Sequence, residues 1–348
     1  MSELRQDPTT KEWVILAPER GKRPIQAPKR KVANDLPSWD ASCPFCPGNE
    51  AKTPEEVFKI PTVSETSSWE VRVVPNRFAA LTPGDDTSPI EDTRFFRKRP
   101  GVGAHEVIIE TPSHNTFMAL MEYEQVEKVL IAYQERYNVL KKNRQLKFIT
   151  IFKNHGWASG TSLVHSHSQL IATPIAATYY HRKFDVAVDC CHDIGGCLYC
   201  DLIAEELAKG DRIVTETEQF VVIHPYASRV PYETWIFPKT HYASFGLFPA
   251  THFAELARVL KDTLFCLYRG LNNPAFNYAI DTSTTEDEQT PCYHWHIRIL
   301  PRLTTIAGFE IGSGIYINPA LPEDTAIYMR EIAKSCPGDV CIAFKDVV

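Results

Sequence analysis

The sequence lacks long apolar runs, an apolar N-terminal segment and an excess of positive charge. Apolar runs such as 107–109 and 220–223 are far shorter than the roughly 20 residues of a membrane-spanning helix. The opening residues, MSELRQDPTTKEW, lack the apolar core of a signal peptide. The formal net charge of −6 argues against unspecific binding to nucleic acid or anionic lipid, although it leaves room for a local basic pocket for a phosphorylated ligand. We therefore expect a cytoplasmic protein with small-molecule partners.

Ten cysteines are present, but we do not expect a disulfide scaffold. The chain is long and its start does not resemble a secretion signal, so its thiols are expected to stay reduced. Four cysteines form two Cys-x-x-Cys pairs, Cys43 with Cys46 and Cys197 with Cys200, a spacing that suits metal binding. The other six, including the neighbours at 190–191, have no such spacing and are interpreted as packing residues.

The chain repeats a pattern along its length. The segments HEVIIETPSHNTF and YETWIFPKTHYASF align without gaps, and eight positions separate Glu106 from His114 just as they separate Glu233 from His241. A Cys-x-x-Cys and a β-like run precede each segment, and a His-x-His follows each one. The recurrence of the whole order indicates a duplicated unit.

An amphipathic helix is predicted after each of these segments, at 122–137 and 250–268, because apolar residues recur there at helical spacing. With 348 residues, of which 44% are hydrophobic, the chain can bury one large or two medium cores. We predict an α+β fold with two histidine-triad-like halves, 1–178 and 179–348. Their mainly antiparallel sheets are expected to join edge to edge into one larger sheet flanked by helices.

Each half offers two thiolates and two imidazoles, a donor set that binds zinc in a closed tetrahedral site. The predicted ligands are Cys43, Cys46, His114 and His165 in the first half, and Cys197, Cys200, His241 and His294 in the second, with His296 as a further candidate. Unrelated core residues could explain one such set, but the repetition argues against that reading. Because the protein fills all four positions, both zinc ions are expected to be structural.

The segment VHSHSQ places His165, His167 and Gln169 on one face of a predicted strand. If His165 binds metal, the strand is fixed and His167 is free to attack phosphorus as a neutral imidazole. Gln169 can donate a hydrogen bond to a phosphoryl oxygen. The spacing alone leaves open that His167 merely supports a zinc ligand.

A loop of small residues precedes the two histidines. Its amides and hydroxyls suit a phosphate group. The residues concerned are Asn154, Gly156, Ser159, Gly160, Thr161 and Ser162.

Together these motifs resemble the galactose-1-phosphate uridylyltransferase branch of the histidine triad superfamily. The likeness lies in Asn-x-Gly-x-x-x-Gly-x-Ser followed by His-x-His-x-Gln, with an upstream Cys-x-x-Cys and Pro-Ser-His. The segments DPTTKEWVILAPERGKRP and VVPNRFAAL extend it over nearly the whole chain. The stretch GFEIGSG, with HSHSQ, also resembles the ADP-glucose phosphorylase members of the family.

The resemblance implies that His167 attacks the α-phosphorus of UDP-glucose, releases glucose 1-phosphate and passes the uridylyl group to galactose 1-phosphate. It also implies a set of binding residues: Arg20 and Arg23 for phosphates, Asn76, Arg77 and Phe78 for the nucleotide, and Asn154, Gly160, Ser162 and Gln169 for the α-phosphate region. In the family the second half supplies hexose-phosphate contacts, often across a dimer interface, so a homodimer is expected.

Alternatives remain open at this point. An ADP-glucose phosphorylase would use phosphate as the acceptor, and a zinc-stabilised module would bind nucleotides without turnover. Hydrolases of the wider superfamily usually carry a third histidine where Gln169 stands, which favours transfer over hydrolysis. In the second half Arg298 replaces that glutamine and EDEQT replaces the small-residue loop. We therefore expect this copy to have lost the reaction and kept its metal and fold.

Overall fold

The computed structural model describes residues 2–22, 36–62, 67–86, 88, 90–91 and 93–336. Its main feature is a ten-stranded sheet in which all neighbours pair antiparallel. The order across the sheet is β10 (Ile213–Glu216), β11 (Phe220–Ile223), β12 (Thr234–Pro238), β14 (His296–Pro301), β13 (Phe276–Asp281), β8 (Phe148–His155), β9 (His167–Thr173), β7 (Ala104–Ile109), β4 (Trp69–Pro75) and β3 (Phe58–Pro61).

This order confirms the predicted duplication. Five strands of the first half run β3-β4-β7-β9-β8 from one edge, and five of the second run β10-β11-β12-β14-β13 from the other. The halves meet where β8 pairs with β13, so the two small sheets form one continuous sheet. The predicted α+β fold with sheets joined edge to edge is therefore confirmed.

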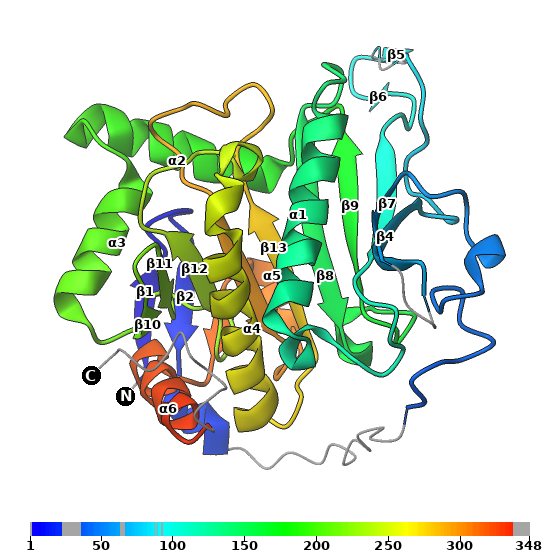
Figure 1. Ribbon diagram of the computed structural model, residues 1–348. Helices are drawn as coiled ribbons and strands as arrows, with labels where there is room; N and C mark the ends of the chain where they lie inside the picture. The colour runs from blue at the N-terminus through cyan, green and yellow to red at the C-terminus, as the bar shows by residue number, and fades with distance from the viewer. Residues whose placement is uncertain are drawn as a thin grey trace.

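One face of the sheet is covered by α1 (Tyr123–Leu140) and α4 (Phe253–Gly270), which lie side by side in front of it (Figure 1). The apolar stripes predicted for these helices are buried against the sheet. They consist of Val126, Val129, Tyr133 and Tyr137 on α1, and of Phe253, Leu256, Leu260 and Leu264 on α4. Helical spacing placed these residues on one face, and burying them supplies the main core.

The opposite face is covered differently in the two halves. In the second half, α2 (Thr178–Ile194) and α3 (Leu198–Lys209) pack on β11 and β12 through a separate apolar cluster. The sequence did not predict these two helices. In the first half a smaller cluster around Cys43 and Cys46 packs on β4 and β7. In the first half, the described residues place no α-helix on the cluster that holds the metal-ligand cysteines.

The remaining elements lie outside the ten-stranded sheet, and the two small sheets among them lie at opposite ends of the molecule (Figure 1). A small sheet joins β1 (Glu3–Gln6), β2 (Trp13–Leu16) and β15 (Tyr316–Asn318), and a two-stranded ribbon joins β5 (Ile90–Glu91) and β6 (Arg97–Lys98). The other helices are α5 (Gly308–Ser313), α6 (Pro322–Lys334) and the 3-10 turns Pro18–Lys22, Glu50–Lys52, Met118–Leu120, Trp157–Ser159, Phe245–Leu247 and Ala250–His252. None of the helices in the described ranges combines the length and apolarity of a membrane span.

The expectation of fully reduced thiols is wrong at two positions. Cys191 on α2 forms a disulfide with Cys292, in the loop before β14, and their Cα atoms lie 5.4 Å apart. The two residues are 101 positions apart in the chain, and they meet because α2 folds over the second half. No spacing pattern in the sequence marks such a pair.

The gapless alignment of the two halves is off by one residue in the sheet. Val107 pairs with Gln169 across β7 and β9, whereas Trp235 pairs with Arg298 across β12 and β14. If Arg298 takes the place of Gln169, Glu233 takes the place of His105 and not of Glu106. Accordingly Glu106 binds Arg136 on the helix-covered face, while the Glu233 carboxylate accepts from the Trp235 indole on the other face.

Candidate active site and metal centres

The four predicted ligands of the first half form one buried cluster. Their ligand atoms lie within 4.8 Å of one another. The Nδ1 of His165 is 3.6 Å from the Sγ of Cys43, and the Nδ1 of His114 is 3.5 Å from the Sγ of Cys46. Ordinary Zn–S and Zn–N bonds at a tetrahedral angle give a sulfur–nitrogen separation of about 3.6 Å. The side chains therefore fit a zinc ion. Because the protein supplies all four ligands, such an ion would have a structural role.

A hydrogen bond from the second ring nitrogen also orients the ligand His165. The Nε2–H of His165 donates to the carbonyl oxygen of Thr111 at 2.7 Å, which leaves Nδ1 as the metal-binding atom. Burial raises the pKa of the Cys43 thiol to about 11 when no cation is present. A divalent metal is the partner that favours the thiolate in such a buried position.

His167 follows this cluster as the first residue of β9. Its Nδ1–H donates to the carbonyl oxygen of His165 at 2.8 Å, so the lone pair lies on Nε2. The ring packs edge-on against Phe45, with the ring centres 5.3 Å apart. Burial lowers the pKa of His167, which keeps the imidazole neutral near pH 7. A neutral ring with a fixed Nδ1–H is suited to nucleophilic attack through Nε2.

A buried polar network supports this strand from its other face. Ser166 and Ser168 both donate to the carboxylate of Glu110, which lies 2.5 Å from the Nζ of Lys153. Lys153 also donates to the carbonyl oxygen of His167 at 3.1 Å. The alternation predicted for VHSHSQ is thus present: the serines bind Glu110, and the histidines face the other way. Sequence reasoning missed Glu110 and Lys153.

Gln169 lies two residues further along β9, and its Oε1 accepts from the Nε2–H of His105 at 2.7 Å. Asn76, predicted to contact the nucleotide, reaches the same oxygen through its Nδ2 at 3.4 Å. Arg77 and Phe78 follow Asn76 in an exposed turn, where the Phe78 ring is 87% exposed. The structure therefore brings Asn76 to Gln169 and leaves the Phe78 ring exposed.

The small-residue loop follows β8 and is shaped by two glycines. Gly156 and Gly160 have φ angles of 76° and 89°, a region that favours glycine. Asn154 lies on β8 beside β9, and its Oδ1 accepts from Asn277 of the second half at 2.7 Å. Thr161 donates to a backbone carbonyl within the loop at 3.0 Å. The adjacent Ser162 is exposed.

Of the two arginines predicted for phosphate binding, Arg20 is not brought to His167 by any contact of the described residues. Arg20 is exposed in the 3-10 turn Pro18–Lys22, which follows β2, and none of the contacts described for it involves His167 or Gln169. Arg23 lies outside the described residues.

The second half repeats the metal cluster. Its four ligand atoms also lie within 4.8 Å of one another. The Sγ of Cys200 lies 3.4 Å from the Nδ1 of His241 and 3.5 Å from the Nδ1 of His294, which again fits tetrahedral zinc geometry. His296 is not part of this cluster: its Nδ1–H donates to the carbonyl oxygen of His294, as His167 does to that of His165.

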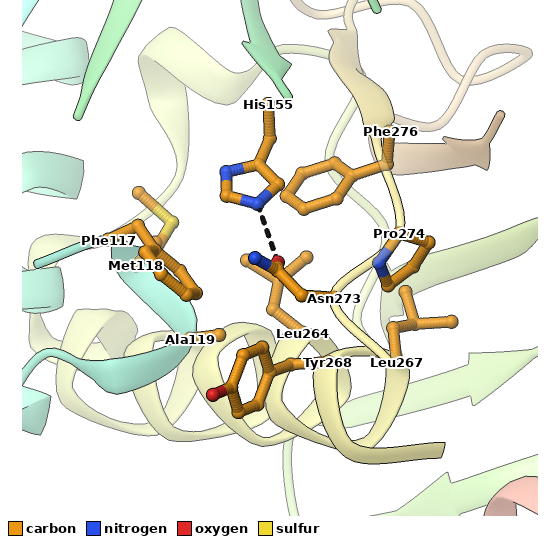
Figure 2. A pocket seen from close by; sticks show the side chains of 10 residues that line it. All are labelled: Phe117, Met118, Ala119, His155, Leu264, Leu267, Tyr268, Asn273, Pro274 and Phe276. Atoms are coloured by element: carbon orange, nitrogen blue, oxygen red, sulfur yellow. Dashed lines mark hydrogen bonds between the residues drawn. The ribbon is translucent and has the colours of Figure 1, made fainter. Parts of the chain in front are cut away.

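A separate apolar pocket lies on the helix-covered face, between the end of β8 and α4 (Figure 2). His155 points into it and binds the side chain of Asn273 through its Nε2 at 2.8 Å. Burial lowers the pKa of His155 to about 4. The pocket is lined mainly by apolar side chains and is separated by the sheet from His167, so it is not part of the candidate active site.

Comparisons with known proteins agree with this arrangement. Residues 1–176 match the family model "Galactose-1-phosphate uridyl transferase, N-terminal domain", and residues 151–335 match the corresponding C-terminal domain. Over 334 residues the chain is 35% identical to an ADP-glucose phosphorylase from Arabidopsis thaliana, covering 95% of this chain and 93% of that protein. A galactose-1-phosphate uridylyltransferase from Thermotoga maritima is 29% identical over 340 residues, covering 95% and 98%.

Solved structures give the same picture. The crystal structure of an ADP-glucose phosphorylase from Arabidopsis thaliana with bound ADP-glucose superimposes with a TM-score of 0.81 at 34% identity, covering 95% of this chain and 98% of that one. A uridylyltransferase structure has a TM-score of 0.74 at 24% identity, covering 97% and 100%, and shows the shared fold.

Proposed function

The chain belongs to the galactose-1-phosphate uridyl transferase family of nucleotidyltransferases and phosphorylases, and we propose that it is an ADP-glucose phosphorylase. It would transfer the adenylyl group of ADP-glucose to phosphate through a covalent His167 intermediate. The sequence motifs alone favour UDP-glucose and galactose 1-phosphate as substrates. The higher identity to the phosphorylase, 35% against 29%, now favours the alternative.

The observation that carries the reaction type is the fixed imidazole of His167. The Nε2 lone pair attacks the α-phosphorus, a P–N bond forms, and the bond from this phosphorus to the bridging oxygen breaks. Glucose 1-phosphate leaves with that oxygen and its electron pair. The carbonyl oxygen of His165 keeps its hydrogen bond to Nδ1–H, and it stabilises the positive charge that develops on the ring.

The second step reverses the bonding. A phosphate oxygen attacks the α-phosphorus, the P–N bond breaks, and its electron pair returns to Nε2, so ADP leaves and the enzyme is regenerated. Asn154 and Gln169 flank this ring from β8 and β9, and their amides are proposed to donate to the phosphoryl oxygens. Zinc at the two Cys/His clusters is proposed to hold the fold around the site, and a homodimer remains the expected assembly.

A labelling experiment tests the proposal. The protein is incubated without an acceptor with ADP-glucose or UDP-glucose that carries ³²P in the α-phosphate. Acid-labile protein label from ADP-glucose, released as ADP by phosphate, is expected. Label only from UDP-glucose, released by galactose 1-phosphate as UDP-galactose, would favour the uridylyl reaction, and no label from either donor would overturn the mechanism.

Two variants control this experiment. H167G should lose all label and keep its zinc content, because His167 is not a ligand. H181A changes an exposed histidine on α2 and should label like the unaltered protein. Loss of zinc in H167G would contradict the separation of His165 as ligand from His167 as nucleophile.

A further inference from the structure

The carboxamide oxygen of Gln169 is held by two side chains from neighbouring elements. The Nε2 of His105, on β7, lies 2.7 Å from Oε1, and the Nδ2 of Asn76, after β4, lies 3.4 Å from it. The amide nitrogen of Gln169 has no partner among the described residues. Since a carboxamide has one oxygen and one NH2 group, occupying the oxygen decides which way the NH2 group points.

Two backbone amides determine the ring tautomer of His105 and the orientation of the Asn76 carboxamide. The N–H of Ala80 donates to the Nδ1 of His105 at 3.1 Å, so the ring proton lies on Nε2 and donates to Gln169. The N–H of Phe78 donates to the Oδ1 of Asn76 at 2.9 Å, so the NH2 group of Asn76 faces Gln169. The Nδ2 of Asn76 and the Nε2 of His105 are 3.1 Å apart because both donate to the Oε1 of Gln169.

We propose that His105 is a positioning residue for the transfer reaction: it keeps the oxygen of Gln169 occupied, so that the NH2 group faces the phosphoryl group on His167. A carboxamide turned by 180° would present its oxygen to a phosphoryl oxygen, which is a repulsive contact. This inference rests on the proposed function, because it assigns the amide to a phosphoryl group bound at His167.

The second half supports the importance of this position. By strand register Glu233 stands where His105 stands, and Arg298 stands where Gln169 stands. The donor and acceptor of the first half are thus matched by a carboxylate and a guanidinium in the second, and the charge of Arg298 acts on Glu233. The Arg298 guanidinium itself pairs with Asp281, whose Oδ2 lies 3.2 Å from Nε. Among the described residues, only the first half presents a free NH2 group beside a histidine with an available Nε2.

Matched substitutions of His105 test the proposal. The amide nitrogen of a glutamine reaches about as far as Nε2 of histidine, whereas that of an asparagine reaches only as far as Nδ1. H105Q should therefore retain most of the rate of His167 labelling in a single turnover. H105N and H105A should lose roughly 10–100-fold, the usual cost of removing a group that orients a functional residue. Equal rates in all three variants would overturn the proposal.

A double-mutant cycle with Q169A separates positioning from a general structural effect. Q169A should slow labelling strongly in the unaltered protein and much less in H105A, because the amide is already misdirected there. Zinc content and thermal midpoint should stay unchanged in H105A. If Q169A has the same effect in both backgrounds, His105 does not act through Gln169.

Labelling and the double-mutant cycle together distinguish failure of the proposed role of His105 from failure of the proposed function. If the unaltered protein forms no acid-labile label from ADP-glucose or UDP-glucose, the covalent mechanism fails. If label forms normally but the cycle shows no coupling, the mechanism stands and the role of His105 is refuted.

Discussion

The Nε2 of His296 lies 3.2 Å from the Nζ of Lys183, at the place in the second half that corresponds to the available Nε2 of His167 in the first. Lys183 comes from α2 and binds Asp281 at 2.7 Å, and Asp281 lies 3.4 Å from the same imidazole nitrogen. His296 is fully buried. A lysine of the helix that covers the second half thus occupies Nε2 of His296, whereas Nε2 of His167 has no hydrogen-bond partner among the described residues.

This contact predicts where a nucleotidyl label resides. After labelling with ADP-glucose or UDP-glucose and proteolysis under alkaline conditions, mass spectrometry should find the adduct on the peptide that contains His167. The peptide that contains His296 should carry none, because a nucleotide cannot reach a buried nitrogen that faces Lys183. An adduct on His296 would contradict the occupied state of its Nε2.

The Lys153–Glu110 pair predicts a large loss of stability when either charge is removed alone. Both side chains are almost completely buried, so K153M leaves an uncompensated carboxylate and E110Q leaves an uncompensated ammonium. Breaking a buried pair in this way costs about 3–5 kcal/mol. Urea unfolding should show this loss for each single variant.

An exposed pair provides the control for that measurement. Lys147 binds Glu286 at the surface, where the side chains are 36% and 63% exposed. K147M should cost less than about 1 kcal/mol. If K153M costs no more than K147M, the buried network does not hold the His167 strand in the way described.

His224 predicts a loss of stability in mild acid. Burial lowers its pKa from 6.5 to about 3, and the ring bonds to Thr325 at 2.7 Å. The folded state therefore binds fewer protons than the unfolded state, so its contribution is complete above pH 6.5 and is lost as the pH falls toward 3. At pH 5 the loss amounts to about 2 kcal/mol.

Comparison of H224N with the unaltered protein measures this contribution. The change in unfolding free energy between pH 7 and pH 5 should be smaller in H224N by about 2 kcal/mol. H181Q, at an exposed position on α2, should show the same pH dependence as the unaltered protein. An unchanged slope in H224N would mean that His224 is protonated in the folded state.

The sequence predicted the ligand clusters because the repeated Cys-x-x-Cys and His-x-His spacings name the ligands directly. It predicted α1 and α4 because their buried stripes have helical spacing. His105 could not be found in this way, since its role depends on the register between β7 and β9, which brings its side chain to that of Gln169, 64 positions away in the chain. The alignment of Glu106 with Glu233 was wrong because seven positions separate Val107 from His114, whereas only six separate the register-equivalent Trp235 from His241.

The two metal clusters predict separable metal losses. The unaltered protein should contain two zinc ions per chain by elemental analysis, and C46S or C200S should each lower this to one, because the clusters use different ligands. C266S changes a buried cysteine outside both clusters and should retain two. Loss of both ions in either ligand variant would show that the two sites are not independent.

The hydrogen bonds of Asn277 predict that the second half of the chain affects the reaction at His167 in the first half. Its Oδ1 accepts from the Nε–H of Arg302 at 2.6 Å, and its NH2 group donates to the Oδ1 of Asn154 and to the carbonyl oxygen of Ser159. The NH2 group of Asn154 therefore faces away from Asn277. In N277D a carboxylate oxygen would face the Asn154 oxygen, and Asn154 would turn its own oxygen toward the phosphoryl group.

N277D should therefore lower the single-turnover rate of His167 labelling by roughly 10–100-fold. N143D makes the same chemical change in an exposed turn, where the oxygen still accepts from the N–H of Gln145, and should label normally. The double variant N277D/N154A should be no slower than N154A alone, because the Asn154 amide is already lost. If N277D slows N154A further, Asn277 acts on the reaction by a route other than Asn154.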